Sequence, residues 1–176
     1  MKRHERALVN LIYNTKLVTG VGAEIGVWKG DLSKVLLGQF PNRRLIMVDA
    51  WDSIPSSNGM MGCVLSDMIA AEAQAREMTV PFGDRAIVIK ASSMEASEEV
   101  PNCSLDYVFI DANHSYESVL QDLIAWEPKL RDGGLLSGHD YNGLMEKRGR
   151  WGVKRAVMEF LGYEPSHEHL VWWTHK

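Results

Sequence analysis

The chain has 176 residues, a length that fits one domain with a sizeable hydrophobic core. Its net charge of −4 argues against nucleic acid or an anionic membrane as the main partner. With only two cysteines, no disulfide framework is expected. The charged amino terminus has the character of neither a signal peptide nor a membrane span. Together these features predict a cytoplasmic protein.

Hydrophobic periodicity divides the chain into alternating helices and short apolar strands. The expected strands cover residues 21–25, 45–48, 86–89, 105–110 and 133–138, with one or two closing strands within 163–176. The expected helices cover residues 3–15, 31–40, 64–77, 115–127 and 153–160, with a short one after 91–93. This alternation predicts an α/β fold, a Rossmann-like doubly wound sheet with helices on both faces. We expect a single domain over 1–176, in which an N-terminal helix (1–17) precedes the core (18–176).

Several local features of these elements can be predicted as well. Asp31 and Ser115 can each cap the helix that follows them. In the helix at 64–77, Leu65, Met68 and Ile69 are expected to face inward. The preceding segment, 52–62, is rich in Ser, Gly and Met, which indicates a loop and a candidate lid.

The strand at 105–110 ends abruptly in Asp111, and His114 follows three residues later. Its β-branched and aromatic composition is typical of a strand buried on both faces of a parallel sheet. Ligands of such sheets bind just beyond the carboxyl ends of the strands. The sequence therefore places Asp111 and His114 where chemistry is expected.

The first strand leads into a glycine-containing loop, residues 24–30, with Glu24 at the strand end. Glycines let the backbone approach a ligand, although a tight turn without a ligand is the alternative. A buried Glu24 needs a partner, which an ammonium group on a ligand or a backbone donor would supply.

Asp49 ends the second strand about 20 residues further on, the spacing typical of an acid that accepts from ribose hydroxyls. Alone it would indicate a turn or cap. Together with the glycine loop it indicates a nucleoside ligand. Trp51 follows closely enough to touch an adenine face, although packing is the simpler role.

Four polar residues follow the fourth and fifth strands: Asp111, His114, His139 and Asp140. Adjacent parallel strands lie about 4.8 Å apart, so these side chains can converge. Asp111, His139 and Asp140 could hold Mg²⁺ or Mn²⁺, or form a hydrogen-bonded network without metal. His114 could act as a general base near neutral pH, or be a capping or surface histidine.

In these motifs the chain resembles the class I S-adenosylmethionine (SAM)-dependent methyltransferases. It is most similar to the small-molecule group that includes macrolide-sugar O-methyltransferases and cephalosporin-hydroxylase-like proteins. The resemblance spans roughly residues 18–174 and is carried by four segments, namely 24–30 (EIGVWKG), 108–116 (VFIDANHSY), 133–141 (GGLLSGHDY) and 152–157 (GVKRAV).

The resemblance implies a seven-stranded sheet with an antiparallel last strand, and a role for each site residue. It implies that Glu24, Gly26 and Gly30 cradle the methionine part of SAM and that Asp49 binds its ribose. It also implies a metal ion at Asp111, His139 and Asp140, although His139 departs from the acid or amide expected at its position. It further implies that Asp111 takes part in catalysis and that His114 is the catalytic base. The expected cofactor contacts are, in full, Glu24, Gly26, Trp28, Gly30, Asp49, Trp51, Ser92, Ser93 and Asp111.

The leading hypothesis is therefore O-methylation of a small hydroxylated molecule, with sugars among the candidate acceptors, SAM as methyl donor and Mg²⁺ or Mn²⁺ as a candidate cofactor. A nicotinamide-dependent oxidoreductase is the second hypothesis, weakened because no G-x-G-x-x-G follows the first strand. A noncatalytic nucleoside-binding module of the same fold is the third. Few residues are left over to enclose a substrate, which is compatible with a homo-oligomer that completes the pocket or with a large substrate.

Overall fold

The computed structural model describes residues 1–52, 64–147, 149 and 151–176. The expected loop and candidate lid at 52–62 therefore lies, apart from its first residue, outside the described residues. Within the described part of the chain, no helix is long and apolar enough to cross a membrane.

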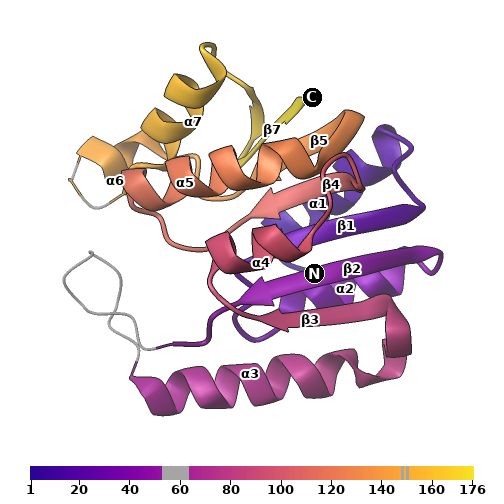
Figure 1. Ribbon diagram of the computed structural model, residues 1–176. Coiled ribbons are helices and arrows are strands. Elements are labelled where there is room, and N and C mark those ends of the chain that lie inside the picture. Colours follow the sequence, from indigo (N-terminus) through magenta and orange to yellow (C-terminus); the bar gives the residue numbers. More distant parts are fainter. Residues whose placement is uncertain (53–63, 148, 150) are drawn as a thin grey trace.

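One sheet of seven strands organises the molecule, in the order β3-β2-β1-β4-β5-β7-β6 (Figure 1). The first five strands run parallel, β7 pairs antiparallel with β5, and β6 pairs antiparallel with β7. This confirms the predicted doubly wound sheet and its antiparallel last strand. The strands are β1 Gly20–Ile25, β2 Arg43–Asp49, β3 Ala86–Lys90, β4 Leu105–Ile110, β5 Leu130–Gly138, β6 Ser166–Glu168 and β7 Val171–His175.

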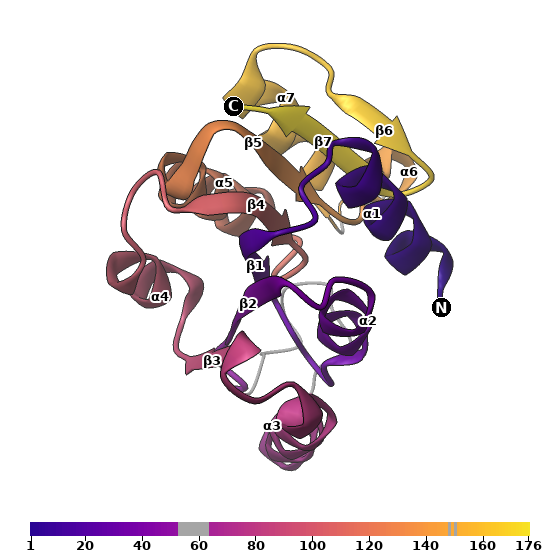
Figure 2. The same ribbon diagram turned by 90° about the vertical axis from the view of Figure 1, so that its right-hand side faces the viewer.

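Helices cover both faces of the sheet, as Figure 2 shows. One core lies beneath α1, α2 and α3, and the second lies beneath α4, α5 and α7. Alternate residues of β4 feed the two cores: Tyr107 and Phe109 point into the first, and Val108 and Ile110 into the second. The helices are α1 Arg3–Asn14, α2 Asp31–Gln39, α3 Leu65–Thr79, α4 Ser93–Glu99, α5 Tyr116–Trp126, α6 Gly143–Lys147 and α7 Val153–Leu161.

The inward face of α3 differs from the prediction. Met68 is buried as expected, but the side chains of Leu65 and Ile69 are 53% and 56% exposed. The buried positions are instead filled by small residues, Ala71 and Ala75. At Ala75 a small side chain is required by close packing against the glycine loop, because a Cβ on Gly30 would lie 2.9 Å from the Cα of Ala75.

The two predicted helix caps have different outcomes. Ser115 caps α5, since its side chain accepts a hydrogen bond from the backbone N–H of Ser118. The cap of α2 is not Asp31 but Gly30, which has a φ of +80°. Asp31 is the first helical residue, and its carboxylate pairs with Lys2 Nζ at 2.8 Å. This pair fastens the start of α1 to the start of α2.

The order of the strands reverses on either side of β1, which pairs with β2 on one side and β4 on the other. Such a switch point opens a crevice at the carboxyl ends of the strands, where ligands of doubly wound sheets bind. The loops that follow β1, β2, β4 and β5 all meet at this edge.

Candidate functional site

The loop after β1 packs directly against the end of β4. Gly26 has a φ of +93°, and a Cβ on it would lie 2.3 Å from the carbonyl oxygen of Asp111. Only glycine fits this position, because any side chain would collide with backbone. The predicted cofactor loop and the predicted catalytic strand end are therefore neighbours.

Asp49, at the end of β2, holds this loop in place. Its Oδ2 accepts hydrogen bonds from the backbone N–H groups of Val27 (2.9 Å) and Trp28 (2.8 Å). Its Oδ1 accepts one from the N–H of Trp51 at 2.8 Å. A carboxylate oxygen can accept more than one hydrogen bond, so these contacts leave acceptor capacity for a ligand. Ribose binding by Asp49 stays a prediction.

Trp28 and Trp51 meet in the same loop. Trp28 adopts a φ of +52°, and its carbonyl accepts a hydrogen bond from Trp51 Nε1 at 2.8 Å. The Trp51 side chain is buried in the core beneath α2 and α3. Trp51 therefore has the packing role that was the simpler expectation, and its contact with an adenine face stays a prediction. The half-exposed Trp28 keeps its place among the predicted cofactor contacts.

Glu24 is a buried acid at the carboxyl end of β1. Ser33 Oγ donates a hydrogen bond to Glu24 Oε2 at 2.6 Å, both side chains being buried. Burial raises the pKa of Glu24 to about 8, against the opposing effect of the Ser33 hydrogen bond. The carboxyl is therefore protonated at neutral pH. Sequence reasoning missed Ser33, since a serine inside a helix carries no signal of a buried partner.

Ser92 and Ser93, after β3, both have structural partners. The Ser92 side chain caps α4 by accepting from the backbone N–H of Glu95. Ser93 Oγ accepts from Trp126 Nε1 at 2.8 Å, which joins α4 to α5. Their contact with the cofactor stays a prediction.

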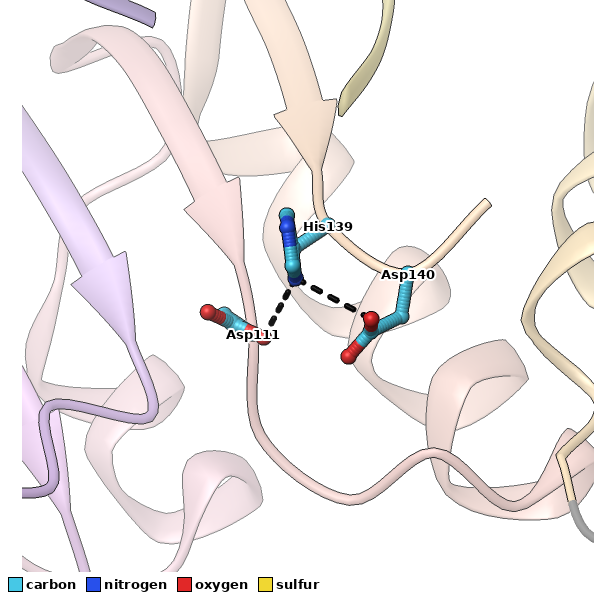
Figure 3. Close-up of side chains that lie close together, drawn as sticks. All are labelled: Asp111, His139 and Asp140. Atoms are coloured by element: carbon cyan, nitrogen blue, oxygen red, sulfur yellow. Dashed lines mark ion pairs between the residues drawn. The ribbon is translucent and has the colours of Figure 1, made fainter. Parts of the chain in front are cut away.

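The acids and one histidine predicted to bind metal do converge (Figure 3). Ligand atoms of Asp111, His139 and Asp140 all lie within 4.8 Å of one another. His139 Nδ1 lies 3.2 Å from Asp140 Oδ1 and 3.7 Å from Asp111 Oδ1. Asp140 has a φ of +57°, a conformation that aspartate tolerates and that turns its carboxylate back toward His139.

His114 lies on the other side of the same acids. Its Nε2 is 2.9 Å from Asp140 Oδ2 and 3.6 Å from Asp111 Oδ1. Burial alone would lower the pKa of His114, but the adjoining carboxylates of Asp111 and Asp140 raise it to about 9. The imidazole ring packs on Trp151, with ring centroids 4.9 Å apart, and the His114 carbonyl accepts from the N–H of Gly152. The position of His114 is thus fixed from two sides.

The charges of the cluster depend on one another. Burial lowers the pKa of His139, but the adjoining Asp140 and Asp111 outweigh it and the net shift is upward. Burial alone would raise the pKa of Asp140, but its ion pairs with His114 and His139 hold the pKa well below its usual range. Asp140 is therefore a carboxylate at neutral pH.

Sequence reasoning missed His4, which belongs to the same site. Helix α1 places the ring of His4 edge-on against that of His139, with centroids 4.7 Å apart. A histidine four residues from the amino terminus gives no signal of this contact, because the contact depends on how α1 crosses the sheet. Trp151 was missed as well.

The residue types of the cluster fit a divalent cation. Two carboxylates and one imidazole offer oxygen and nitrogen donors from two neighbouring strand ends, and one of the acids is held ionised. The arrangement can therefore bind metal, and His114 lies beside it as a proton acceptor or donor.

Comparisons with known proteins identify the family to which the chain belongs. A family model described as a methyltransferase domain matches residues 23–141, which include the carboxyl end of β1, all of β4 and β5, and the acid–histidine cluster. No curated protein is similar enough in sequence to match the chain.

Solved structures show the same fold at low sequence identity. A Corynebacterium glutamicum protein is 17% identical over 100% of this chain and 81% of its own, with a TM-score of 0.70. The O-methyltransferase NovP is 20% identical over 98% of this chain and 78% of its own, with a TM-score of 0.66. Burkholderia thailandensis 1,6-didemethyltoxoflavin-N1-methyltransferase, solved with S-adenosylhomocysteine bound, is 14% identical over 80% of this chain and 54% of its own, with a TM-score of 0.54.

The family match decides among the hypotheses that the sequence left open. It covers more than half of the chain and includes both the glycine loop and the predicted catalytic strand ends. It favours methyl transfer over hydride transfer to a nicotinamide. The chain belongs to the methyltransferase-domain family and is a class I SAM-dependent methyltransferase.

Proposed function

We propose that the protein transfers the methyl group of SAM to a hydroxyl oxygen of a small molecule, with sugars among the candidate acceptors, and that a divalent cation assists. The observation that carries this proposal is the convergence of Asp111, His114, His139 and Asp140 beside the glycine loop of β1. A hydroxyl must lose its proton during transfer, so a base and a cation at one point suit oxygen as the acceptor.

The loops at the switch point would bind SAM. Gly26 and Gly30 supply a close-lying backbone, with Trp28 beside them. Asp49, already fixed by backbone N–H groups, retains acceptor capacity for ribose hydroxyls. Glu24 lies at the end of β1, where a cofactor ammonium group would favour its ionised form.

When bound, SAM supplies an electrophilic methyl group, and a cation held by Asp111, His139 and Asp140 would lower the pKa of a nearby hydroxyl. The residues must then align the acceptor oxygen and take its proton. His114 is placed for this role, because it lies against the same acids and is anchored by Trp151. Since the pKa of His114 is about 9, its neutral fraction increases with pH, and we expect turnover to rise as pH approaches that value.

A surface hollow that shares no lining residue with the acid–histidine cluster is a further candidate region for part of a small-molecule acceptor. It lies between α6 and α7, has a volume of about 800 Å³, and is within the size range of small-molecule sites. Arg155, which lines it, stacks on Tyr116 just after His114. Its lining residues are Gly143, Leu144, Glu146, Lys147, Lys154, Arg155, Met158 and Glu159.

The oligomeric state and the cellular location form part of the same proposal. Val64, Leu65 and Ile69 present exposed apolar side chains along the start of α3, which supports a homo-oligomer that covers them. Light scattering of the wild type and of Ile69→Glu would test this. A low cysteine count supports a reducing, cytoplasmic location.

A methyl-transfer assay tests the proposal. The protein would be incubated with SAM, Mn²⁺ and a panel of hydroxylated acceptors, and the methylated product would be identified by mass spectrometry. We expect oxygen-linked methylation that falls by a factor of about 100 or more in His114→Gln and is unchanged in His169→Gln, an exposed histidine on the turn before β7. Methylation of nitrogen, or full activity of His114→Gln, would contradict it.

A further inference from the structure

The metal-binding residues of the cluster are not all of one type, and their difference has consequences for which ion is bound. Asp111 comes from the end of β4, and His139 and Asp140 come from the end of β5. Mg²⁺ prefers an all-oxygen, octahedral shell that includes several waters, whereas imidazole nitrogen suits later first-row ions such as Co²⁺ and Zn²⁺. A histidine in the set therefore bears on selectivity.

His139 directs a nitrogen into the cluster rather than away from it. Its Nδ1 lies 3.2 Å from Asp140 Oδ1 and 3.7 Å from Asp111 Oδ1, as Figure 3 shows. The backbone of His139 is also fixed, because its N–H donates to the carbonyl of Ile110 at 3.0 Å. The side chain is only 14% exposed, so this nitrogen faces the two acids more than solvent.

The opposite side of the ring is held by α1. His4 lies edge-on against His139 with ring centroids 4.7 Å apart, and α1 is itself held against the sheet by its buried side chains Leu8 and Ile12. A contact of this kind restricts rotation of the His139 ring. Groups around a ligating histidine that fix its orientation commonly change metal affinity by about 10 to 100 fold.

The geometry points to a first-row transition-metal ion, rather than Mg²⁺, as the occupant of the Asp111–His139–Asp140 site, with His139 as the residue that sets this preference and His4 as its positioning residue. This inference rests on the proposed function, because it names the ion of the site that we propose assists methyl transfer. It goes beyond that function because it concerns which ion binds, independently of the acceptor.

Metal titration of the tag-free protein tests the inference without an activity measurement. Mg²⁺, Mn²⁺ and Co²⁺ would each be titrated by calorimetry into the wild type, His139→Asp and His169→Asp. His169→Asp is the matched control, because it makes the same replacement at an exposed histidine on the turn before β7. Tighter binding of Co²⁺ than of Mg²⁺ is expected of most nitrogen–oxygen sites, so the decisive quantity is the change in their ratio.

We expect the preference for Co²⁺ over Mg²⁺ to fall by about tenfold or more in His139→Asp and to be unchanged in His169→Asp. The visible absorption of bound Co²⁺ should change only in His139→Asp. If His139→Asp does not fold, His139→Asn, which is neutral and offers an amide oxygen, should lower the ratio in the same direction. His4→Ala should weaken Co²⁺ binding, and His4→Phe, which keeps a ring against His139, should restore most of it.

The outcomes separate this inference from the proposed function. Metal binding with the same ratio in the wild type and His139→Asp would overturn the inference and leave metal assistance standing. No binding of any of the three ions by a wild type that still binds SAM would overturn the inference and the metal part of the proposed function together. Equal Co²⁺ affinity in His4→Ala and the wild type would refute the positioning role of His4.

Discussion

Replacing Glu24 with glutamine tests the physical basis of the cofactor loop. Glu24 is 2% exposed at the carboxyl end of β1, and burial raises its pKa to about 8 from an unperturbed value of 4.5. Between these two pH values the folded protein keeps a proton that the unfolded chain has released. The free energy of unfolding therefore falls as pH rises through this window.

The size of this effect follows from the pKa difference. Each unit is worth about 1.4 kcal/mol, so holding the Glu24 proton at pH 7 costs the folded state about 3 kcal/mol. Glutamine has nearly the same shape, never ionises, and can still accept the hydrogen bond from Ser33. Glu24→Gln should accordingly be more stable than the wild type by about 3 kcal/mol at pH 7 and by less than about 1 kcal/mol at pH 5.

Urea unfolding of both proteins at the two pH values measures this difference. Glu98→Gln, at an exposed position on α4, is the matched control and should show no pH-dependent gain. The reasoning fails if Glu24→Gln is less stable than the wild type at pH 7, or if its gain is the same at both pH values.

The same substitution separates stability from function. If the Glu24 carboxylate pairs with the ammonium group of SAM, binding at pH 7 must release its proton. Calorimetry in two buffers of different ionisation enthalpy should then report proton release by the wild type and none by Glu24→Gln. The variant should also bind SAM more weakly although it is more stable.

The other predictions concern His114, Gly26 and Tyr107. Burial lowers the pKa of His114 but its ion pairs raise it to about 9, so the stabilisation that the charged His114 provides is complete below the unperturbed pKa of 6.5 and is lost as pH rises through 9. His114→Gln should therefore lower the free energy of urea unfolding by up to about 3 kcal/mol near pH 6 and by little above pH 9. A loss independent of pH would contradict the ion pairing. Gly26→Ala places a Cβ 2.3 Å from the Asp111 carbonyl oxygen at a φ of +93°. We expect the free energy of unfolding to fall by more than about 2 kcal/mol, measured as a lower melting temperature, and SAM binding to weaken. Unimpaired binding would show that the loop does not contact the cofactor. The hydroxyl of Tyr107 is buried without a hydrogen-bond partner among residues 1–52, 64–147, 149 and 151–176, so Tyr107→Phe should leave urea stability unchanged or raise it by about 1 kcal/mol, and a clear loss would reveal a partner such as a bound water.

Much of the sheet could be predicted because its signals are local. The apolar run that becomes β4 ends at Asp111, and Ser115 caps the next helix as its sequence position indicates. The convergence of Asp111, His139 and Asp140 also followed from sequence, since parallel strands bring their carboxyl ends to one edge.

The features that sequence could not predict depend on packing between distant elements. Leu65 and Ile69 have the spacing of an inward face but are exposed, and the buried face of α3 includes Ala75, whose small side chain is set by the close approach of Gly30. Trp51 follows the ribose-binding candidate, yet its place in the core depends on the Trp28 carbonyl that engages it. Likewise, the contact of His4 with His139 requires the path of α1 across the sheet.

Titration of SAM by calorimetry tests the central claim most directly. It would compare the wild type with Asp49→Asn, and with Asp84→Asn as the matched control at an exposed position before β3. We expect saturable binding, in a ratio of one SAM per chain, by the wild type and Asp84→Asn. Binding by Asp49→Asn should be clearly weaker, because the Asp49 carboxylate that this variant lacks fixes the loop. Absence of binding by the wild type, or equal binding by all three proteins, would contradict the assignment of this edge of the sheet as the SAM site.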